Sequence, residues 1–319
     1  MPAEHSTNNG TFMANLGYYV LYGIWYALSL LPFWILYLIS DFFFLIVYYL
    51  VRYRRKVVRD NLSQSFPEKS LSEIIAIEKR FYHFFCDYIV ETLKMCSISD
   101  KEMSKRMVFR GLKQEAVDIF EKEKKGFIFL YLGHYGNWEW ITSVVKSIPD
   151  YAFGGQIYHP LYNKVFDRLF LNIRSRFGGE CIPMKQTLRK VIELRRQSKP
   201  TVIGFISDQL PKWNSIHFFV PFLHRDTAVF TGAEQIGKQV GAAYFFAEIK
   251  RPKRGYYECT FHRMEPLDPA QTEFDMTVMF MNRLEKMIQE TPELWLWTHK
   301  RWKRTKEEWL ERQKKGIQS

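Results

Sequence analysis

The segment FIFLYLGHYGNWEW, residues 127–140, carries the strongest fold signal in the sequence. Its first six residues are all apolar or aromatic, which is typical of a strand buried on both faces of a sheet. Gly133 and Gly136 follow on either side of His134 and permit a sharp turn. In α/β sheets, ligands bind at the carboxyl ends of the strands. The segment therefore predicts an α/β domain with a catalytic turn at His134.

Helical and strand patterns alternate around this segment, and this alternation predicts an α/β domain built around one sheet. We expect strands at 127–132, 151–157, 201–206, 242–249 and 256–263, and helices at 71–95, 113–124 and 274–290, with another starting at Asn137. The 71–95 helix is preceded by Ser70, and Glu73 stands at the spacing of a capping box.

An uncharged stretch, residues 18–40, is long enough to cross a ~30 Å hydrocarbon layer as a helix. It lacks the basic start and small-residue cleavage site of a signal peptide, so we expect a lasting membrane anchor. Pro32 either kinks this helix or ends it, and a second apolar run continues to Val51. The alternative is a buried apolar hairpin of a soluble protein. The basic segment RYRRKVVR, residues 52–59, places the following domain in the cytoplasm.

The net charge of +12 favours acidic partners such as anionic lipids, phosphorylated substrates or an acidic carrier protein. Aromatic residues make up 17% of the chain, which favours contact of some of them with lipid or an acyl chain. No recognised DNA- or RNA-binding motif is present, so we expect no nucleic-acid partner. The four cysteines form no C-x-x-C pair, which argues against a zinc ribbon or a disulfide framework.

His134 and Glu139 are the candidate acid–base pair. On a continuous helix, five residues would turn them about 140° apart, so they can meet only if His134 lies in the turn and Glu139 in the first helical turn. A carboxylate on one ring nitrogen would then fix the tautomer and leave the other nitrogen to accept a proton from a hydroxyl. This chemistry requires no nucleophile on the enzyme.

Two other readings of the same residues remain open. A metal hydrolase would use His134 and Glu139 with Asp208, His217 or His224, although no compact pair such as H-E-x-x-H is present. A non-catalytic membrane scaffold would need none of these side chains.

Several ordered blocks resemble the late acyltransferases of lipid A biosynthesis, within the lysophospholipid acyltransferase superfamily. GHYGNWEW is similar to the family's H-x-x-N-W-E form of the H-x-x-x-x-(D/E) motif. The other similar blocks are RRKVVRDNLSQSFPE (54–68), YHPLYNKVFDRLFLNIRSRFGG (158–179), FISDQ (205–209), FFVPFLHRDTAVFTGAEQIGKQVGA (218–242) and WLWTHKRWK (295–303). The resemblance covers nearly the whole chain. It implies a single mixed sheet flanked by helices, with an N-terminal membrane helix.

The resemblance implies roles for residues at matching positions. His134 would be the base and Glu139 its partner, Asp208 matches the aspartate of the D-Q block, and either Arg174 or Arg176 would stabilise the oxyanion. The implied substrate-binding residues are Asn137, Tyr158, His159, Gln209 and Arg301. The pattern departs from the family at His159, where arginine is usual, and at residues 220–222, where Val-Pro-Phe replaces a glycine-bearing run.

The resemblance also implies an enzyme of the bacterial inner membrane, with its catalytic domain facing the cytoplasm. It would transfer an acyl chain from acyl carrier protein to a hydroxyl of a glycolipid, with no cofactor and no metal. The resulting division is a membrane anchor over residues 1–51, a basic juxtamembrane and helical segment over 52–110, and an α/β acyltransferase domain over 111–319. Another glycolipid, an aminolipid or a lysophospholipid is the alternative acceptor.

Overall fold

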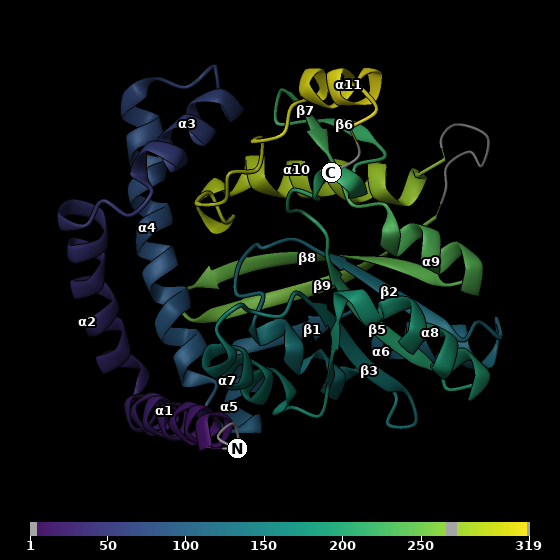
Figure 1. Ribbon diagram of the computed structural model, residues 1–319, viewed down its shortest axis with the longest axis horizontal. Coiled ribbons are helices and arrows are strands. Elements are labelled where there is room, and N and C mark those ends of the chain that lie inside the picture. The colour runs from purple at the N-terminus through teal and green to yellow at the C-terminus, as the bar shows by residue number, and fades with distance from the viewer. Residues whose placement is uncertain (1–4, 266–272, 318–319) are drawn as a thin grey trace.

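A seven-stranded mixed sheet forms the centre of the molecule (Figure 1). The computed structural model describes residues 5–265 and 273–317, with only the backbone described for residues 5–16. The strand order is β1-β9-β8-β2-β5-β3-β4. The strands are β1 Met107–Arg110, β2 Phe127–Leu132, β3 Phe153–Tyr158, β4 Glu180–Pro183, β5 Thr201–Ile206, β8 Ala243–Lys253 and β9 Tyr256–Met264. This arrangement confirms the predicted α/β fold with one mixed sheet.

Strand β2 lies in the middle of the sheet, and all six of its residues are buried. It pairs in parallel with β5 on one side and with β8 on the other. Strand β9 turns back antiparallel to β8, and β1 pairs in parallel with β9. The uninterrupted apolar run of β2 is thus explained by neighbours on both edges and helices on both faces.

Helices surround the sheet (Figure 1). The α-helices are α1 His5–Ser29, α2 Phe33–Phe44, α3 Arg55–Ser65, α4 Leu71–Lys94, α5 Asp100–Arg106, α6 Lys113–Glu121, α7 Lys164–Ser175, α8 Thr187–Arg196, α9 Gly232–Val240, α10 Asp275–Glu290 and α11 Lys306–Lys314. A small antiparallel pair, β6 Phe219–Phe222 with β7 Arg225–Ala228, lies on the far side of α10 from the sheet. The capping box predicted at Ser70 and Glu73 is formed at the start of α4.

The helix expected from Asn137 is instead a 3₁₀ helix, Trp140–Ser147. The side chain of Asn137 accepts a hydrogen bond from the Trp140 N–H, and the Thr142 N–H bonds the Glu139 carbonyl three residues back. The β-branched residues Ile141, Thr142, Val144 and Val145 also disfavour an α-helix. Because this turn is tight, the residues after His134 stay close to the end of β2.

The predicted N-terminal span over residues 18–40 is wrong as a single helix. Helix α1 ends at Ser29, and α2 begins after Pro32, whose backbone is extended and which has no N–H to continue the helical ladder. By length and composition, one helix among the described residues can cross a membrane, and it runs from Phe33 to Leu50. Its last turn, Leu45–Leu50, is π-helical.

Helix α2 stands beside α4 along one side of the molecule, and α1 runs across the base, packed against α7 and α4 (Figure 1). Exposed large apolar side chains are concentrated on the outer surface of these N-terminal helices. They are Tyr19, Val20, Ile24, Tyr26, Leu28, Leu30, Trp34, Leu38, Phe42, Phe43, Leu45, Tyr49, Leu50, Val51 and Tyr53. So large an apolar surface is typical of lipid contact.

The inner side of α2 is polar and joins the helix firmly to the domain. Ser40 donates to the buried carboxylate of Asp87 on α4 at 2.7 Å. Arg254, in the turn between β8 and β9, bridges Asp41 and Asp87. Tyr37 donates to Glu91 at 2.9 Å. Helix α2 is therefore an integral part of the domain packing as well as an apolar surface.

Candidate functional site

The candidate site lies at the carboxyl ends of two neighbouring parallel strands. Leu132 at the end of β2 is in register with Ile206 at the end of β5. His134 and Asp208 each follow two residues later, so the sheet register brings them together from positions 74 residues apart. The end of β5 therefore lies directly beside the glycine turn that carries His134.

The imidazole of His134 is held by Asp208. The distance between His134 Nδ1 and Asp208 Oδ1 is 2.6 Å, and the His134 backbone N–H donates to Asp208 Oδ2 at 2.9 Å. An ionised carboxylate only accepts hydrogen bonds, so Nδ1 carries the proton and Nε2 carries the lone pair. The Gln209 amide lies 3.2 Å from His134 Nε2 and can donate to it. This is the tautomer that a general base requires.

Asp208 is buried, yet it stays ionised. Burial acts to raise the pKa of Asp208, but the attraction of His134 and the hydrogen bonds from His134 and Trp295 outweigh it, so the pKa is lowered. The Trp295 indole N–H donates to Asp208 Oδ2 at 2.8 Å. The Asp208 side chain is 2% exposed whereas that of His134 is 19% exposed, so the histidine is the member of the pair that a substrate can reach.

The backbone of the turn is fixed by glycine and by the C-terminal block. A Cβ on Gly133 would lie 2.9 Å from Leu284 and 3.4 Å from Asp208 Oδ2, so glycine permits the close approach of the two strand ends. Gly136 has a positive φ of +58°, and its N–H donates to the Leu294 carbonyl. The Leu296 N–H donates to the His134 carbonyl.

Glu139 does not hold the His134 ring as expected; Asp208 occupies that position. The Glu139 carboxylate instead forms a two-point ion pair with Arg174 of α7, at 2.7 Å from Nε and 2.6 Å from Nη2. The five-residue spacing suggested a local contact, but the partner of the ring comes from the next strand. Burial acts to lower the pKa of Arg174, but Glu139 outweighs it and raises the pKa. Arg174 therefore remains charged.

Aromatic side chains connect the two charged pairs. The Trp138 ring packs edge-on against the His134 ring with centroids 5.3 Å apart, and stacks on Tyr88 of α4 at 4.1 Å. The Tyr88 hydroxyl lies 3.4 Å from Glu139 Oε1. The His134–Asp208 and Arg174–Glu139 pairs thus belong to one packed assembly.

Asn137 lies in the interior, and both ends of its amide are engaged by the protein. Its Nδ2 donates to Glu91 Oε2 at 2.8 Å, and its Oδ1 accepts from the Trp140 N–H. Asn137 is 0% exposed, so its side chain positions the turn; the substrate contact expected of it does not fit this geometry.

Glu91 of α4 is a fully buried carboxylate that joins several elements. It accepts hydrogen bonds from Tyr37 of α2, Asn137 of the catalytic turn and Tyr257 of β9, at 2.9, 2.8 and 2.8 Å. Its backbone carbonyl also accepts from the Trp140 indole. Burial raises the pKa of Glu91. The carboxylate ties the apolar helix α2 to the turn that carries His134.

The structure separates the two candidate arginines. Arg174 pairs with Glu139, whereas Arg176 Nη1 donates to the Met95 carbonyl at 2.7 Å, at the end of α4. Tyr158, at the end of β3, has a raised pKa, chiefly because of burial, and lies near enough to Arg174 to interact electrostatically. His159 is exposed, with Nδ1 2.9 Å from the Pro160 carbonyl.

The C-terminal block contributes one buried cation, Arg301, and an aromatic ring on which Arg225 of β7 stacks. Arg301 is 1% exposed and donates to the Ala228 carbonyl at 2.6 Å, and burial lowers its pKa to about 10. Its Nε and Nη1 are buried and have no hydrogen-bond partner among the described residues. Arg225 stacks on Trp302, with its guanidinium carbon 3.2 Å from the ring centroid. A direct contact of Arg301 with substrate stays a prediction.

The rival sets of residues are placed differently. Among the described residues, no three side chains of the metal-ligating types come together, so Asp208, His217 and His224 do not form a group. Cys181 on β4 contacts Gln156 and Ser175, and its pKa is raised, mainly by burial. Ser207, the other side chain that could serve as an acyl-enzyme nucleophile, is buried, with 5% of its surface exposed.

Sequence reasoning missed three residues that build this site: Trp295, Glu91 and Tyr257. Trp295 lies in the closing WLWTHKRWK block, so the resemblance pointed to this segment but not to the hydrogen bond from Trp295 to Asp208. Glu91 is an acidic residue on an otherwise amphipathic helix, and the pattern of α4 does not distinguish it from a solvent-exposed charge.

A histidine whose ring is oriented by a buried aspartate at the end of a strand is typical of enzymes that use general acid–base chemistry, transferases and hydrolases among them. The chain matches the model of the bacterial lipid A biosynthesis acyltransferases over residues 10–304, and it belongs to this family. No curated protein matches the chain. The family is one of acyltransferases, so the reaction uses an acyl donor and a lipid acceptor.

Proposed function

We propose that this protein transfers a fatty acyl chain from acyl carrier protein directly to a hydroxyl of a lipid A precursor, with His134 as the general base. The observation that carries the proposal is the hydrogen bond between His134 Nδ1 and the buried Asp208 carboxylate, which leaves Nε2 free to accept a proton. His134 is partly exposed, so an acceptor hydroxyl can take the place of the Gln209 amide beside Nε2.

In the proposed step, the acceptor oxygen attacks the thioester carbonyl carbon while its proton moves to His134 Nε2. Asp208 stabilises the imidazolium that forms, because its negative charge lies against Nδ1–H. The tetrahedral intermediate then collapses, the C–S bond breaks, and the imidazolium returns the proton to the leaving thiolate. The enzyme ends the cycle in its starting protonation state, and no cofactor or metal enters these steps.

Arg174 is the proposed stabiliser of the oxyanion. Nε and Nη2 of Arg174 both donate to the Glu139 carboxylate. Among the described residues, no acceptor takes a hydrogen bond from Nη1 of Arg174. The two-point pair fixes the plane of the guanidinium, so Nη1 is held in place before the reaction. Glu139 is thus proposed to act by positioning Arg174 rather than by orienting His134.

A two-step route through an acyl-enzyme is less well supported. The thiol of Cys181 contacts Gln156 and Ser175, neither of which is a base, and burial raises its pKa. A thiol with a raised pKa holds less thiolate at neutral pH and is a poor nucleophile. Ser207 is buried in the interior.

The surface of the molecule fits the proposed substrates and location. The apolar outer side of α1 and α2 favours contact with the bacterial inner membrane, and the charge of +12 favours an acidic carrier and a phosphorylated lipid. In the segment that was proposed to set a cytoplasmic orientation, Arg55 and Arg59 pair with the buried Glu78. Arg52 and Lys56 are exposed and remain available to anionic lipid.

The test is acyl transfer by the purified full-length protein in lipid nanodiscs, with acyl carrier protein bearing the acyl chain and a lipid A precursor as acceptor. Mass spectrometry should detect the precursor with one added acyl chain, and His134→Ala should lower the rate at least about a hundredfold. The control is His262→Ala, which removes a histidine paired with Glu248 on β8 and β9. If only an aminolipid, a lysophospholipid or another glycolipid is acylated, that lipid replaces the lipid A precursor as the proposed acceptor. If no lipid is acylated, the result favours a non-catalytic membrane scaffold.

A further inference from the structure

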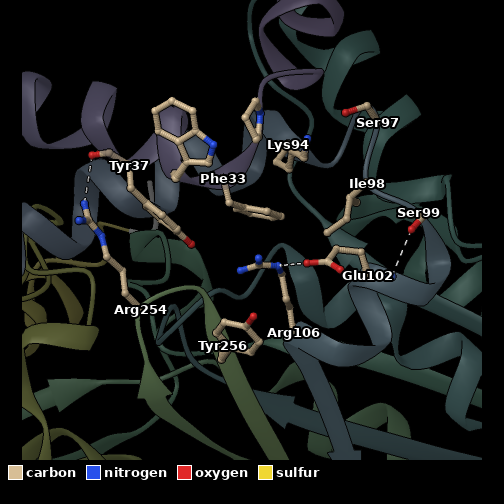
Figure 2. Close-up of a pocket in the computed structure, with 12 residues that line it drawn as sticks. Phe33, Tyr37, Lys94, Ser97, Ile98, Ser99, Glu102, Arg106, Arg254 and Tyr256 are labelled. Carbon is tan, nitrogen blue, oxygen red and sulfur yellow. Dashed lines mark hydrogen bonds and ion pairs between the residues drawn. The ribbon is translucent and has the colours of Figure 1, made fainter.

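A cavity whose lining does not include His134 lies at the junction of α1 and α2. Its volume is about 670 Å³, and α4, α5 and β9 complete its walls. Figure 2 shows the cavity between aromatic side chains of α2 and cationic side chains of the domain. None of the residues around it belongs to the catalytic turn, to β5 or to α7.

Arg106 forms the floor of this cavity. Its guanidinium lies between two aromatic rings, 3.5 Å from the centroid of Phe33 and 4.6 Å from that of Tyr256. Nε pairs with Glu102 at 2.6 Å, and Nη1 donates to the Gly255 carbonyl at 3.1 Å. No described residue accepts a hydrogen bond from Nη2, and Figure 2 shows the guanidinium projecting into the cavity. A preorganised guanidinium of this kind suits an anionic oxygen.

Lys94 supplies a second positive charge. Its ammonium donates to the carbonyls of Ser29 and Leu31 at 2.6 and 2.9 Å, where α1 ends. Within the described part of the chain, no carboxylate lies within ion-pair distance of it. Because an ammonium has three donors, one remains for a ligand.

The charges around the cavity sum to about one positive unit. Arg254 and Arg251 together balance Asp41 and Asp87. Glu102 offsets one of the two charges of Arg106 and Lys94. The amino terminus of α2 also faces this region, with no acidic residue in its first turn. A group with a single negative charge would therefore balance the site.

The α2 side of the cavity continues into the apolar surface described above. Trp34 lines the cavity and is 65% exposed, and Leu30, two residues before Pro32 of the cavity wall, is 60% exposed. A ligand whose charged head occupies the cavity can therefore extend its apolar part along these side chains, in the region where lipid is expected.

We infer that this cavity binds the phosphodiester headgroup of an anionic membrane phospholipid, with its acyl chains along Leu30 and Trp34. A phosphodiester carries one negative charge and two free oxygens, which matches Arg106 Nη2 and the free donor of Lys94. This site is independent of the acyl transfer proposed above, and its test requires no turnover.

The experiment is a calorimetric titration of the delipidated full-length protein in neutral detergent with dioctanoyl phosphatidylglycerol. The matched ligand is dioctanoyl phosphatidylcholine, which has the same chains but no net charge, and a third titration uses inorganic phosphate. Phosphatidylglycerol should bind at least about tenfold more tightly than phosphatidylcholine. Equal affinities for the two lipids would overturn the inference, and so would binding of inorganic phosphate as tight as that of phosphatidylglycerol.

Variants locate the binding. Arg106→Gln should weaken phosphatidylglycerol binding about tenfold or more, whereas Arg110→Gln, which removes an exposed arginine four residues further along, should change it less than about twofold. If Arg106→Gln does not fold, Lys94→Gln carries the same expectation. Full binding by a folded Arg106→Gln or Lys94→Gln protein would place the lipid elsewhere and refute the site.

Discussion

Replacing Asp208 by asparagine should nearly abolish turnover while the protein still folds. Oδ2 of Asp208 accepts from both the His134 backbone N–H and the Trp295 indole, so the amide oxygen of asparagine takes that position. The amide nitrogen then faces His134 Nδ1 and donates to it. This reverses the tautomer, and Nε2 becomes a donor that can no longer accept the hydroxyl proton.

The expected loss follows from this reversal. Carboxylate-to-amide changes at an equivalent histidine partner reduce turnover by about 10⁴-fold, and at about 1.36 kcal/mol per factor of ten this is roughly 5 kcal/mol of activation free energy. Two of the three hydrogen bonds to the side chain persist, so the melting temperature should change by only about a few degrees.

The assay measures single-turnover acyl transfer by wild-type and Asp208→Asn protein, with the melting temperature of each. Glu248→Gln is the matched control, because Glu248 Oε2 lies 2.6 Å from His262 Nε2 in a second histidine–carboxylate pair, formed between β8 and β9. The control should retain wild-type activity. A folded Asp208→Asn protein with more than about a tenth of the wild-type rate would refute the role of Asp208.

Three further experiments test the surrounding contacts. Glu91→Leu removes the acceptor of the Tyr37, Asn137 and Tyr257 hydrogen bonds, so turnover should fall. Glu91→Gln keeps an amide oxygen for Asn137 and Tyr257 and should retain more of the turnover; equal turnover of the two folded variants contradicts the positioning role. Glu139→Gln leaves the Arg174 guanidinium without its counter-charge, so the free energy of unfolding in urea should fall by about 2 kcal/mol. An unchanged value would show that the ion pair contributes no net stability. The pKa of the Cys181 thiol is raised, so its thiolate forms at a higher pH than that of a free cysteine. The rate of its alkylation should therefore rise with a midpoint above about pH 8.5. A midpoint below that pH would make Cys181 a candidate nucleophile again.

The sequence predicted the fold where local patterns were strong. The apolar run before Gly133, the strand at 201–206 and the capped helix after Ser70 appear at the expected positions, because buried strands and capped helices leave regular patterns. The break at Pro32 was foreseen only as one of two outcomes. A proline can kink a helix or end it. Here the helix ends, and α2 makes polar contacts with α4 that the local sequence does not reveal.

The sequence predicted which residues belong to the candidate site, but it did not predict which of them pair with one another. His134, Asp208, Glu139 and Arg174 were all expected, yet Glu139 was assigned to His134 because it lies five residues away in the sequence. The register of β2 with β5 brings Asp208 to His134 instead, and α7 brings Arg174 to Glu139. Such pairings depend on tertiary packing, so spacing along the chain does not determine them.

Direct transfer by His134 is the central claim, and initial rates at varied concentrations of acyl donor and lipid acceptor test it most directly. Attack on the thioester in a ternary complex predicts reciprocal plots that intersect, and no acylated protein when the enzyme is mixed with donor alone. Parallel plots, together with an acyl group trapped on Cys181 or Ser207 that later passes to the acceptor, would contradict the account.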